Sequence, residues 1–258
     1  KNLSATMNEY KAKGAYGVVM NCKTGGVLAM ASLPDYDCNE PYKLTYSKNI
    51  KAIEKITDED EKIAAKSEAI QNQWNNFVTS STYEPGSVFK TFIAAAALEE
   101  NIVNLNTTYT CTGSIRVKDY VMRCHYHPGH GTETFTQGLE NSCNPFFITV
   151  GQKLGVHNYF KYFEAFGFTQ KTGIDLPGEA GSQYYKENQY GLVELSSASF
   201  GQSNSLTPIQ LCTGLCAIAN GGTLLKPYVV DHIVDANGNT VKKTQPTEIR
   251  RVISEDTS

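Results

Sequence analysis

The sequence lacks a long hydrophobic run, a strong net charge and internal repeats. No apolar segment approaches the roughly 20 residues that cross a bilayer, and no signal-peptide pattern stands at the start. The formal net charge of -3 gives no electrostatic reason to expect nucleic acid as a partner. The chain opens in a lysine-rich segment, residues 1–13, without an initiator methionine. We therefore expect an excised part of a longer protein, in which these absences exclude no cellular location.

The number of cysteines is odd, which argues against a disulfide framework. There are 7 cysteines in 258 residues, whereas disulfide frameworks are normally even and serve smaller domains. We therefore expect most of them to be buried thiols. Hydrophobic residues make up 40% of the chain and charged residues 19%. This is the balance of a globular protein that is long enough to bury a substantial core.

Apolar patterns near both ends of the chain predict strands. Residues 16–21 and 27–32 are short apolar runs around a glycine-rich turn, and residues 224–234 precede the hairpin turn Asn237-Gly238. Helices are predicted between them, at residues 51–72, 89–100, 145–154 and 208–219, the last with Thr207 as its N-cap. Strands at both ends with helices between them predict an α+β fold, in which an antiparallel sheet packs on a helical layer.

The first candidate site is a serine at the head of an alanine-rich helix. Residues 83–90 read YEPGSVFK, so Ser87 and Lys90 form S-x-x-K, and positions three apart share one face of a helix. A serine hydroxyl needs a neighbouring base to become a nucleophile, and a lysine can serve if burial and positive potential lower its pKa. Alternatively, both residues lie on the surface of an ordinary helix.

A second candidate site is S-x-N at Ser142 and Asn144, which we predict to lie in a turn between two helices. A hydroxyl there can relay a proton between Lys90 and a leaving group, and an amide can bind a substrate backbone. The same two side chains can instead cap the ends of the flanking helices.

With these motifs the chain resembles the class B penicillin-binding proteins. The resemblance is carried by five ordered blocks and runs over nearly the whole chain: residues 17–32, 83–90, 141–145, 170–181 and 199–211. The stretches GSQYYKENQYG and SFGQSNSLTPIQL look most like the sporulation-specific members from spore-forming Gram-positive bacteria. The resemblance implies the penicillin-binding-protein and serine β-lactamase-like transpeptidase fold over residues 1–258.

The resemblance further implies a serine D,D-transpeptidase that cross-links peptidoglycan stem peptides. Ser87 would form the acyl-enzyme, Lys90 would be the general base, Ser142 the proton relay and Asn144 a ligand of the substrate amide. β-Lactams would acylate the same serine, and the chemistry would need no cofactor. The family also implies a membrane anchor outside this chain, an extracytoplasmic catalytic domain and a cell-wall synthesis complex, with no nucleic acid.

Lys171-Thr172-Gly173 matches the K-T-G motif of this family, but we expect it to be a decoy. A catalytic K-T-G lies on a core strand, whereas Asp175 and Pro177 interrupt a strand here, because proline removes a ladder donor. In the resembling family the catalytic K-T-G follows the final hairpin. We therefore expect a domain that is truncated before this strand and its C-terminal neighbours, without the third wall of its active site.

Cysteine and histidine side chains gather in residues 111–130. Thiolate and imidazole groups in a tetrahedral set are the ligands that Zn²⁺ prefers. We predict a structural zinc that supports the wall of the active site. Its predicted ligands are Cys111, Cys124, His127 and His130, and His125 or Asp119 could replace one of them. Alternatively, the segment is a hairpin with buried thiols and surface imidazoles.

Two other functions stay open from the sequence. A serine β-lactamase or β-lactam sensor would share S-x-x-K, although no deacylating glutamate motif follows Ser142. A non-catalytic, zinc-dependent scaffold of a cell-wall assembly would use the cysteine and histidine residues without any chemistry at Ser87.

Overall fold

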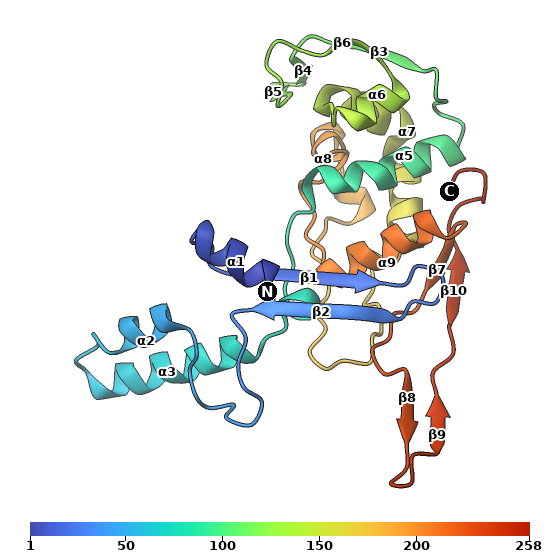
Figure 1. Cartoon of the computed structure of the whole chain (residues 1–258). Helices are drawn as coiled ribbons and strands as arrows, with labels where there is room; N and C mark the ends of the chain where they lie inside the picture. The colour runs from blue at the N-terminus through green and yellow to red at the C-terminus, as the bar shows by residue number, and fades with distance from the viewer.

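Helix α5 (Lys90–Glu99) lies in the middle of the helical layer because its sequence is apolar on nearly every side. Its four consecutive alanines, residues 94–97, are all buried, and their small side chains let neighbouring elements approach closely. Helix α7 (Asn144–Ala165) packs along α5, and Phe89 and Phe92 contribute to the main hydrophobic core between them. The computed structural model describes residues 1–258 (Figure 1).

The N-terminal strands form an antiparallel hairpin beside this layer. Strand β1 (Ala15–Met20) pairs with β2 (Val27–Leu33). Helices α1 (Asn2–Glu9) and α9 (Pro208–Ala219) both pack against β1. Short helix α4 (Phe77–Ser80) also contacts the hairpin and contributes Val78 to a small second core. The hairpin is therefore attached to the helical layer mainly through α9 and α4.

Helices α2 (Ser47–Ile53) and α3 (Glu59–Trp74) form an arm that projects from the body of the molecule (Figure 1). The side chain of Asp58 caps α3 by accepting a hydrogen bond from the Glu61 N–H. Only Ala69 and Ile70 are buried along α3, so most of this helix faces solvent.

Two short strand pairs and a helix lie at one end of α7. Strands β3 (Thr108–Cys111) and β6 (Gly131–Thr134) pair with each other, as do β4 (Ser114–Val117) and β5 (Tyr120–Arg123). Strand β6 leads into α6 (Phe135–Glu140), where Thr134 and Gln137 form a capping box. Residues 141–143 then connect α6 to α7, so this short turn joins the strand pairs to the helical core.

The remaining elements return the chain to the hairpin side. The 3₁₀ turn η2 (Glu187–Gln189) precedes α8 (Leu192–Ala198), which packs on α7 and leads to α9. After α9, strand β7 (Thr223–Leu225) pairs with β10 (Glu248–Arg251). Between them, β8 (His232–Val234) and β9 (Thr240–Lys243) form a hairpin that projects from the molecule (Figure 1).

The structure confirms the predicted α+β fold and changes several details. Both predicted hairpins form, and α9 begins directly after its predicted cap, Thr207. The helix predicted at residues 51–72 is two helices, because Asp58 starts a new one. The helix predicted at 145–154 continues to Ala165 through a kink at Gly155, where φ is 76°. The strands form five separate antiparallel pairs rather than one continuous sheet.

None of the helices combines the length and the apolar character that crossing a membrane requires.

Candidate active site

Ser87 follows a tight turn in which two glycines let the backbone segments meet. Gly86 has a φ of 60°, and its N–H donates to the Gly201 carbonyl at 2.9 Å. A Cβ atom on Gly201 would lie 1.9 Å from the Gly86 oxygen, so this contact requires glycine. Ser87 comes next, in the 3₁₀ turn η1 (Gly86–Phe89), and is exposed. The turn therefore presents the serine to solvent.

Lys90 begins α5 directly after this turn. A 3₁₀ helix has three residues per turn, so the side chains of residues i and i+3 lie on the same face. The Lys90 Nζ atom is 3.1 Å from Ser87 Oγ. Lys90 is only 1% exposed, in contrast to the exposed Ser87. The structure thus brings the predicted serine and lysine into contact, with the amine in the protein interior.

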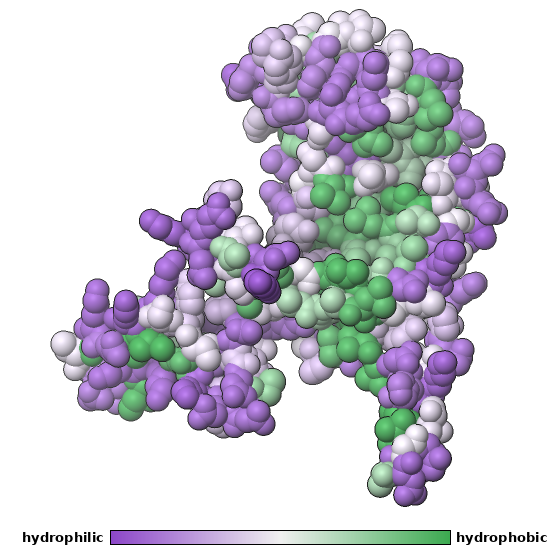
Figure 2. Space-filling model, in the orientation of Figure 1, coloured by the Kyte–Doolittle hydropathy of each residue, from purple (hydrophilic) through white to green (hydrophobic).

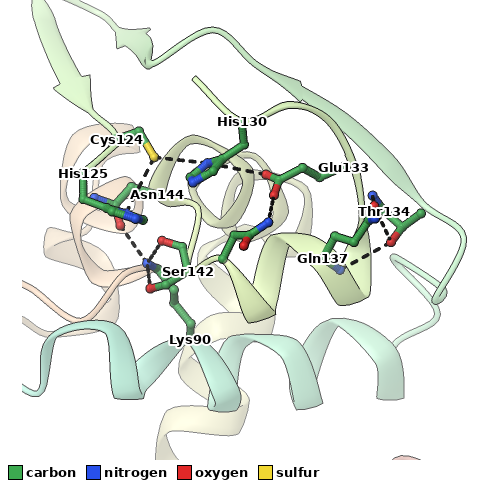
Figure 3. A network of polar contacts seen from close by, with 10 residues as sticks. Lys90, Cys124, His125, His130, Glu133, Thr134, Gln137, Ser142 and Asn144 are labelled. Atoms are coloured by element: carbon green, nitrogen blue, oxygen red, sulfur yellow. Dashed lines mark hydrogen bonds and ion pairs between the residues drawn. The ribbon is translucent and has the colours of Figure 1, made fainter. Parts of the chain in front are cut away.

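Four oxygen atoms surround the Lys90 amine. In addition to Ser87 Oγ, Nζ lies 2.8 Å from Ser142 Oγ, 2.7 Å from the Ser142 carbonyl oxygen and 2.7 Å from Asn144 Oδ1. Figure 3 shows Ser142 and Asn144 converging on this amine from the segment above α5. All four residues predicted from the two motifs therefore meet at one atom.

The kinds of oxygen around Nζ determine how its hydrogen atoms can be used. The Ser142 carbonyl and Asn144 Oδ1 can only accept hydrogen bonds, whereas the hydroxyls of Ser87 and Ser142 can also donate. A neutral amine can give its two N–H groups to the first pair and keep a lone pair for one hydroxyl. Burial lowers the pKa of Lys90 to about 8. The site therefore holds an amine that can be neutral close to neutral pH.

Ser142 has a backbone conformation that residues other than glycine rarely adopt. Its φ is 52°, immediately after α6, at a position where glycine commonly ends a helix. The Ser142 N–H donates to the Leu139 carbonyl, which closes the turn. Such strain costs on the order of 1–3 kcal/mol and persists where the surroundings hold it. Here the turn directs both oxygens of Ser142 at Lys90 and lets α7 begin at Asn144.

The K-T-G at Lys171-Thr172-Gly173 lies in an irregular segment and not on a strand. The Glu179 carboxylate accepts hydrogen bonds from the N–H groups of Thr172 and Gly173, at 2.6 Å and 3.0 Å, and from the Thr172 hydroxyl at 2.7 Å. Because these donors are already bonded within the chain, they have a structural role here. This placement agrees with the expectation that the motif is a decoy.

Three thiols and one imidazole converge beside the Ser142 turn. The ligand atoms of Cys111, Cys124, His130 and Cys143 all lie within 4.8 Å of one another, and the three cysteines are buried. Cys124 Sγ is 3.6 Å from His130 Nδ1 (Figure 3). A tetrahedral zinc, about 2.3 Å from sulfur and 2.0–2.1 Å from nitrogen, separates two such ligand atoms by about 3.6 Å. The donor set and this spacing therefore fit zinc.

The structure does not bring His127 into this cluster, and Cys143 lies there instead. Residues 126–129 form a turn in which the Gly129 N–H donates to the Tyr126 carbonyl, and His127 is exposed on it. The substitutes His125 and Asp119 are exposed as well. Cys143 was missed because it is distant in sequence from the other ligands. Its position between the two motif residues Ser142 and Asn144 was the feature of the sequence that could have revealed it.

Glu133 is a further buried group that the sequence did not reveal. It is 3% exposed, and its Oε1 atom accepts a hydrogen bond from Asn141 Nδ2 at 2.5 Å. Its Oε2 atom has no hydrogen-bond partner and lies 3.6 Å from His130 Nδ1. Figure 3 shows Glu133 beside His130, on the side away from Lys90. Glu133 thus links the position of His130 to Asn141, the residue before Ser142.

Known proteins resemble this chain in sequence. The family model for the penicillin binding protein transpeptidase domain matches residues 15–258. Stage V sporulation protein D of Bacillus subtilis is 38% identical over 252 residues, which cover 97% of this chain and 35% of that protein. The probable peptidoglycan D,D-transpeptidase FtsI of Caulobacter vibrioides is 26% identical over 259 residues, covering 99% of this chain and 37% of that protein. The chain therefore spans about a third of the length of these relatives.

Solved structures agree with the family match. Penicillin-binding protein 3 of Mycobacterium tuberculosis, complexed with aztreonam, has a TM-score of 0.80 and 27% identity, covering 99% of this chain and 52% of that one. The D,D-transpeptidase domain of a peptidoglycan glycosyltransferase from Eggerthella lenta has a TM-score of 0.79 and 25% identity, covering 99% and 61%. The family match, the fold and the residues around Lys90 together show that the chain belongs to the penicillin-binding protein transpeptidase domain family.

Proposed function

We propose that this chain is the catalytic domain of a serine D,D-transpeptidase that cross-links peptidoglycan stem peptides. The observation that carries the proposal is the position of Lys90 Nζ between the hydroxyls of Ser87 and Ser142, at 3.1 Å and 2.8 Å. The names of relatives support it, since FtsI of Caulobacter vibrioides and MrdA of Escherichia coli are both called peptidoglycan D,D-transpeptidases.

In the acylation step, neutral Lys90 takes the hydroxyl proton of Ser87 as the oxygen attacks the penultimate D-Ala carbonyl of a stem peptide. The amide bond to the terminal D-Ala breaks, and its nitrogen leaves as an amine. The Ser142 hydroxyl, which also contacts Lys90 Nζ, passes the proton from Lys90 to that nitrogen. Asn144 binds the substrate backbone through its amide. No cofactor is needed, because the proton moves only among side chains of this site.

In the second step, an amine of a neighbouring stem attacks the Ser87 ester. The incoming amine loses a proton through the same Ser142–Lys90 path, and Ser87 regains its hydroxyl hydrogen as the new peptide bond forms. β-Lactams acylate Ser87 by the first step alone, because their opened ring remains attached to the acyl group. This part of the proposal is supported by the aztreonam complex of the related penicillin-binding protein 3.

The third wall of the site is a strand that carries a second K-T-G and supplies a further oxyanion-hole donor beside the Ser87 N–H. Three observations support this part of the proposal. The K-T-G at residue 171 is held by Glu179. Strand β1 has a paired strand on only one edge, and an open edge favours further pairing. Figure 2 shows a continuous apolar surface over β1, α5 and α9, which such strands would cover.

A structural zinc on Cys111, Cys124, Cys143 and His130 braces this site. Cys143 lies between Ser142 and Asn144, so fixing its sulfur fixes the turn that points both neighbours at Lys90. The metal holds the geometry and takes no part in acyl transfer, since no ligand contacts Ser87. Glu133 supports the proposed site by lying against His130.

The domain acts outside the cytoplasm, attached to a membrane anchor elsewhere in the protein, within a cell-wall synthesis complex. Its substrates are stem peptides, and β-lactams are its inhibitors. A role in building the spore wall is supported by the 38% identity to Stage V sporulation protein D. This identity is well above the 26–28% shared with FtsI, MrdA and the mycobacterial PbpB proteins.

Penicillin is expected to form a stoichiometric covalent adduct at Ser87 that lasts for hours, because a transpeptidase lacks a rapid route to hydrolysis. Intact-mass spectrometry of the full-length protein measures it, and peptide mapping locates it. Ser87→Ala should abolish the adduct, whereas Ser47→Ala, at the exposed serine that begins α2, should leave it unchanged. Rapid return to the free mass would instead show a β-lactamase, and no adduct at all would favour a non-catalytic scaffold.

The rate of acylation by penicillin is expected to rise with pH through about 8, the pKa to which burial lowers Lys90. The base must be neutral, so its active fraction increases from about 9% at pH 7 to about 91% at pH 9, which is about tenfold. Stopped-flow measurements between pH 6 and 10 give the profile. Lys90→Arg, which stays protonated, should slow acylation by at least about 100-fold at every pH. A profile that is flat across this range contradicts the role of Lys90.

Elemental analysis is expected to find one zinc per chain. Cys143→Ser should remove the zinc and lower the melting temperature by more than about 5 °C, given that 1 kcal/mol shifts a domain of this size by about 2–4 °C. It should also slow acylation, although Cys143 contacts no substrate. Cys212→Ser, which removes a thiol on α9 outside the cluster, should keep the zinc. A zinc-free protein whose melting temperature does not respond to added zinc would refute the site.

A further inference from the structure

A polar cluster is buried among the aromatic side chains of the main core. Asn204 is 3% exposed, and its amide lies between the hydroxyls of two buried tyrosines. Its Nδ2 atom donates to the Tyr159 hydroxyl oxygen at 2.6 Å, and its Oδ1 atom accepts from the Tyr190 hydroxyl at 2.7 Å. Buried polar groups are destabilising unless they are hydrogen-bonded. The three side chains satisfy one another and form one unit, and none of them is part of the proposed proton path from Ser87.

The loop that carries Asn204 contains a strained residue. Residues 201–206, the 201–206 loop, lie in the connection between α8 and α9. Ser203 has a φ of 69°, a left-handed conformation that is rare for residues other than glycine. Such strain persists where the surroundings hold the backbone in place. Asn204 follows directly, so the two tyrosine hydroxyls fix the loop next to its strained position.

The 201–206 loop is bonded to the segment that leads into the Ser87 turn. Four hydrogen bonds of 2.9–3.0 Å join it to residues 83–86: Tyr83 N–H to the Leu206 carbonyl, Leu206 N–H to the Tyr83 carbonyl, Gly86 N–H to the Gly201 carbonyl, and Ser203 N–H to the Glu84 carboxylate. In the loop, these bonds lie on both sides of Asn204. A displacement of the loop would therefore move the turn that carries the serine.

Tyr159 connects the cluster to the same turn by a second route. Its ring packs against the Phe89 ring, with centroids 6.3 Å apart, and Phe89 belongs to η1 together with Ser87. The Tyr159 ring also packs against Tyr190, with centroids 5.4 Å apart. One tyrosine thus contacts both the amide of the loop and the aromatic side chain that follows the nucleophile by two residues.

We propose that Asn204 is a positioning residue for the nucleophile. Held by Tyr159 and Tyr190, it fixes the 201–206 loop and, through that loop, the turn in which Ser87 Oγ faces the Lys90 amine. The inference rests on the proposed transpeptidase function and adds to it residues that neither motif contains. Because all three cluster residues are buried, they act through the turn and not by contact with a substrate. A misplacement of about 1 Å can slow a reaction by about 100-fold.

The test is penicillin acylation of the full-length protein, with its rate from stopped-flow and its final amount from intact mass. Asn204→Leu removes both hydrogen bonds at similar side-chain size, and Tyr190→Phe removes one and keeps the ring. The rate should fall by at least about tenfold in the first and about threefold in the second. The final adduct should still reach one per chain. The pH midpoint should be unchanged, since the cluster acts on Ser87 and not on Lys90.

Tyr162→Phe is the matched control. It removes the hydroxyl of another buried tyrosine on α7, which bonds to Glu100 at 2.7 Å and not to the loop. It should lower the melting temperature about as much as Tyr190→Phe does, but change the acylation rate by less than about twofold. If Asn204→Leu does not fold, the comparison of Tyr190→Phe with this control decides alone.

Three results would overturn the positioning role while the transpeptidase function stands. They are wild-type rates in the folded Asn204 and Tyr190 variants, a smaller amount of adduct that forms at the wild-type rate, and a shifted pH midpoint. The second would show that only the folded fraction had changed, and the third that the cluster acts on the base. No acylation of the wild-type protein would instead contradict the proposed function itself.

Discussion

The burial of the Lys90 amine among four oxygen atoms is the constraint on which the surrounding structure depends. A charged ammonium at this depth is costly, so burial favours the neutral form and lowers the pKa of Lys90 to about 8. Each neighbouring element supplies one part of the enclosure. The alanine-rich helix α5 places Lys90 in the core, the Gly86–Gly201 contact fixes the serine turn, and the strained Ser142 turn brings two further oxygens. None of these parts would produce a usable base alone.

The turn at residues 142–144 belongs to two sites at once. Ser142 and Asn144 face Lys90, while Cys143 between them faces the other thiols and His130. Backbone strain at Ser142, on the order of 1–3 kcal/mol, needs support from the surroundings. The hydrogen bonds that end α6 give part of that support, and the proposed zinc would give the rest. With the proposed zinc bound, the cysteine–histidine cluster would support both the fold and the candidate active site.

Much of the active site could be predicted from the sequence because its geometry is local. Ser87 and Lys90 are three residues apart, and Ser142 and Asn144 are two apart, so each pair follows from one turn of backbone. The expectation that the two pairs contact each other came from the family resemblance and not from their spacing.

The membership of the cysteine–histidine cluster depends on tertiary structure. Cys143 reaches the other three residues only because α6 and α7 fold back on the strand pairs, and His127 turns outward with residues 126–129. Element types were predictable from apolar patterns, whereas the break at Asp58 and the separation of the strands into pairs depended on capping and packing.

A direct measurement of the Lys90 pKa tests the neutral-base role of this residue without relying on any substrate. Lysines labelled with ¹³C at the ε-carbon report their own titration by NMR, and Lys90→Arg assigns the signal. The structure predicts a single lysine that titrates near 8, well below the ordinary value near 10.5. The same signal should shift when Ser142→Ala removes one of the two hydroxyls beside the amine. A Lys90 that titrates near 10.5 would contradict the mechanism, because the amine would then be charged at neutral pH and unable to accept the proton of Ser87.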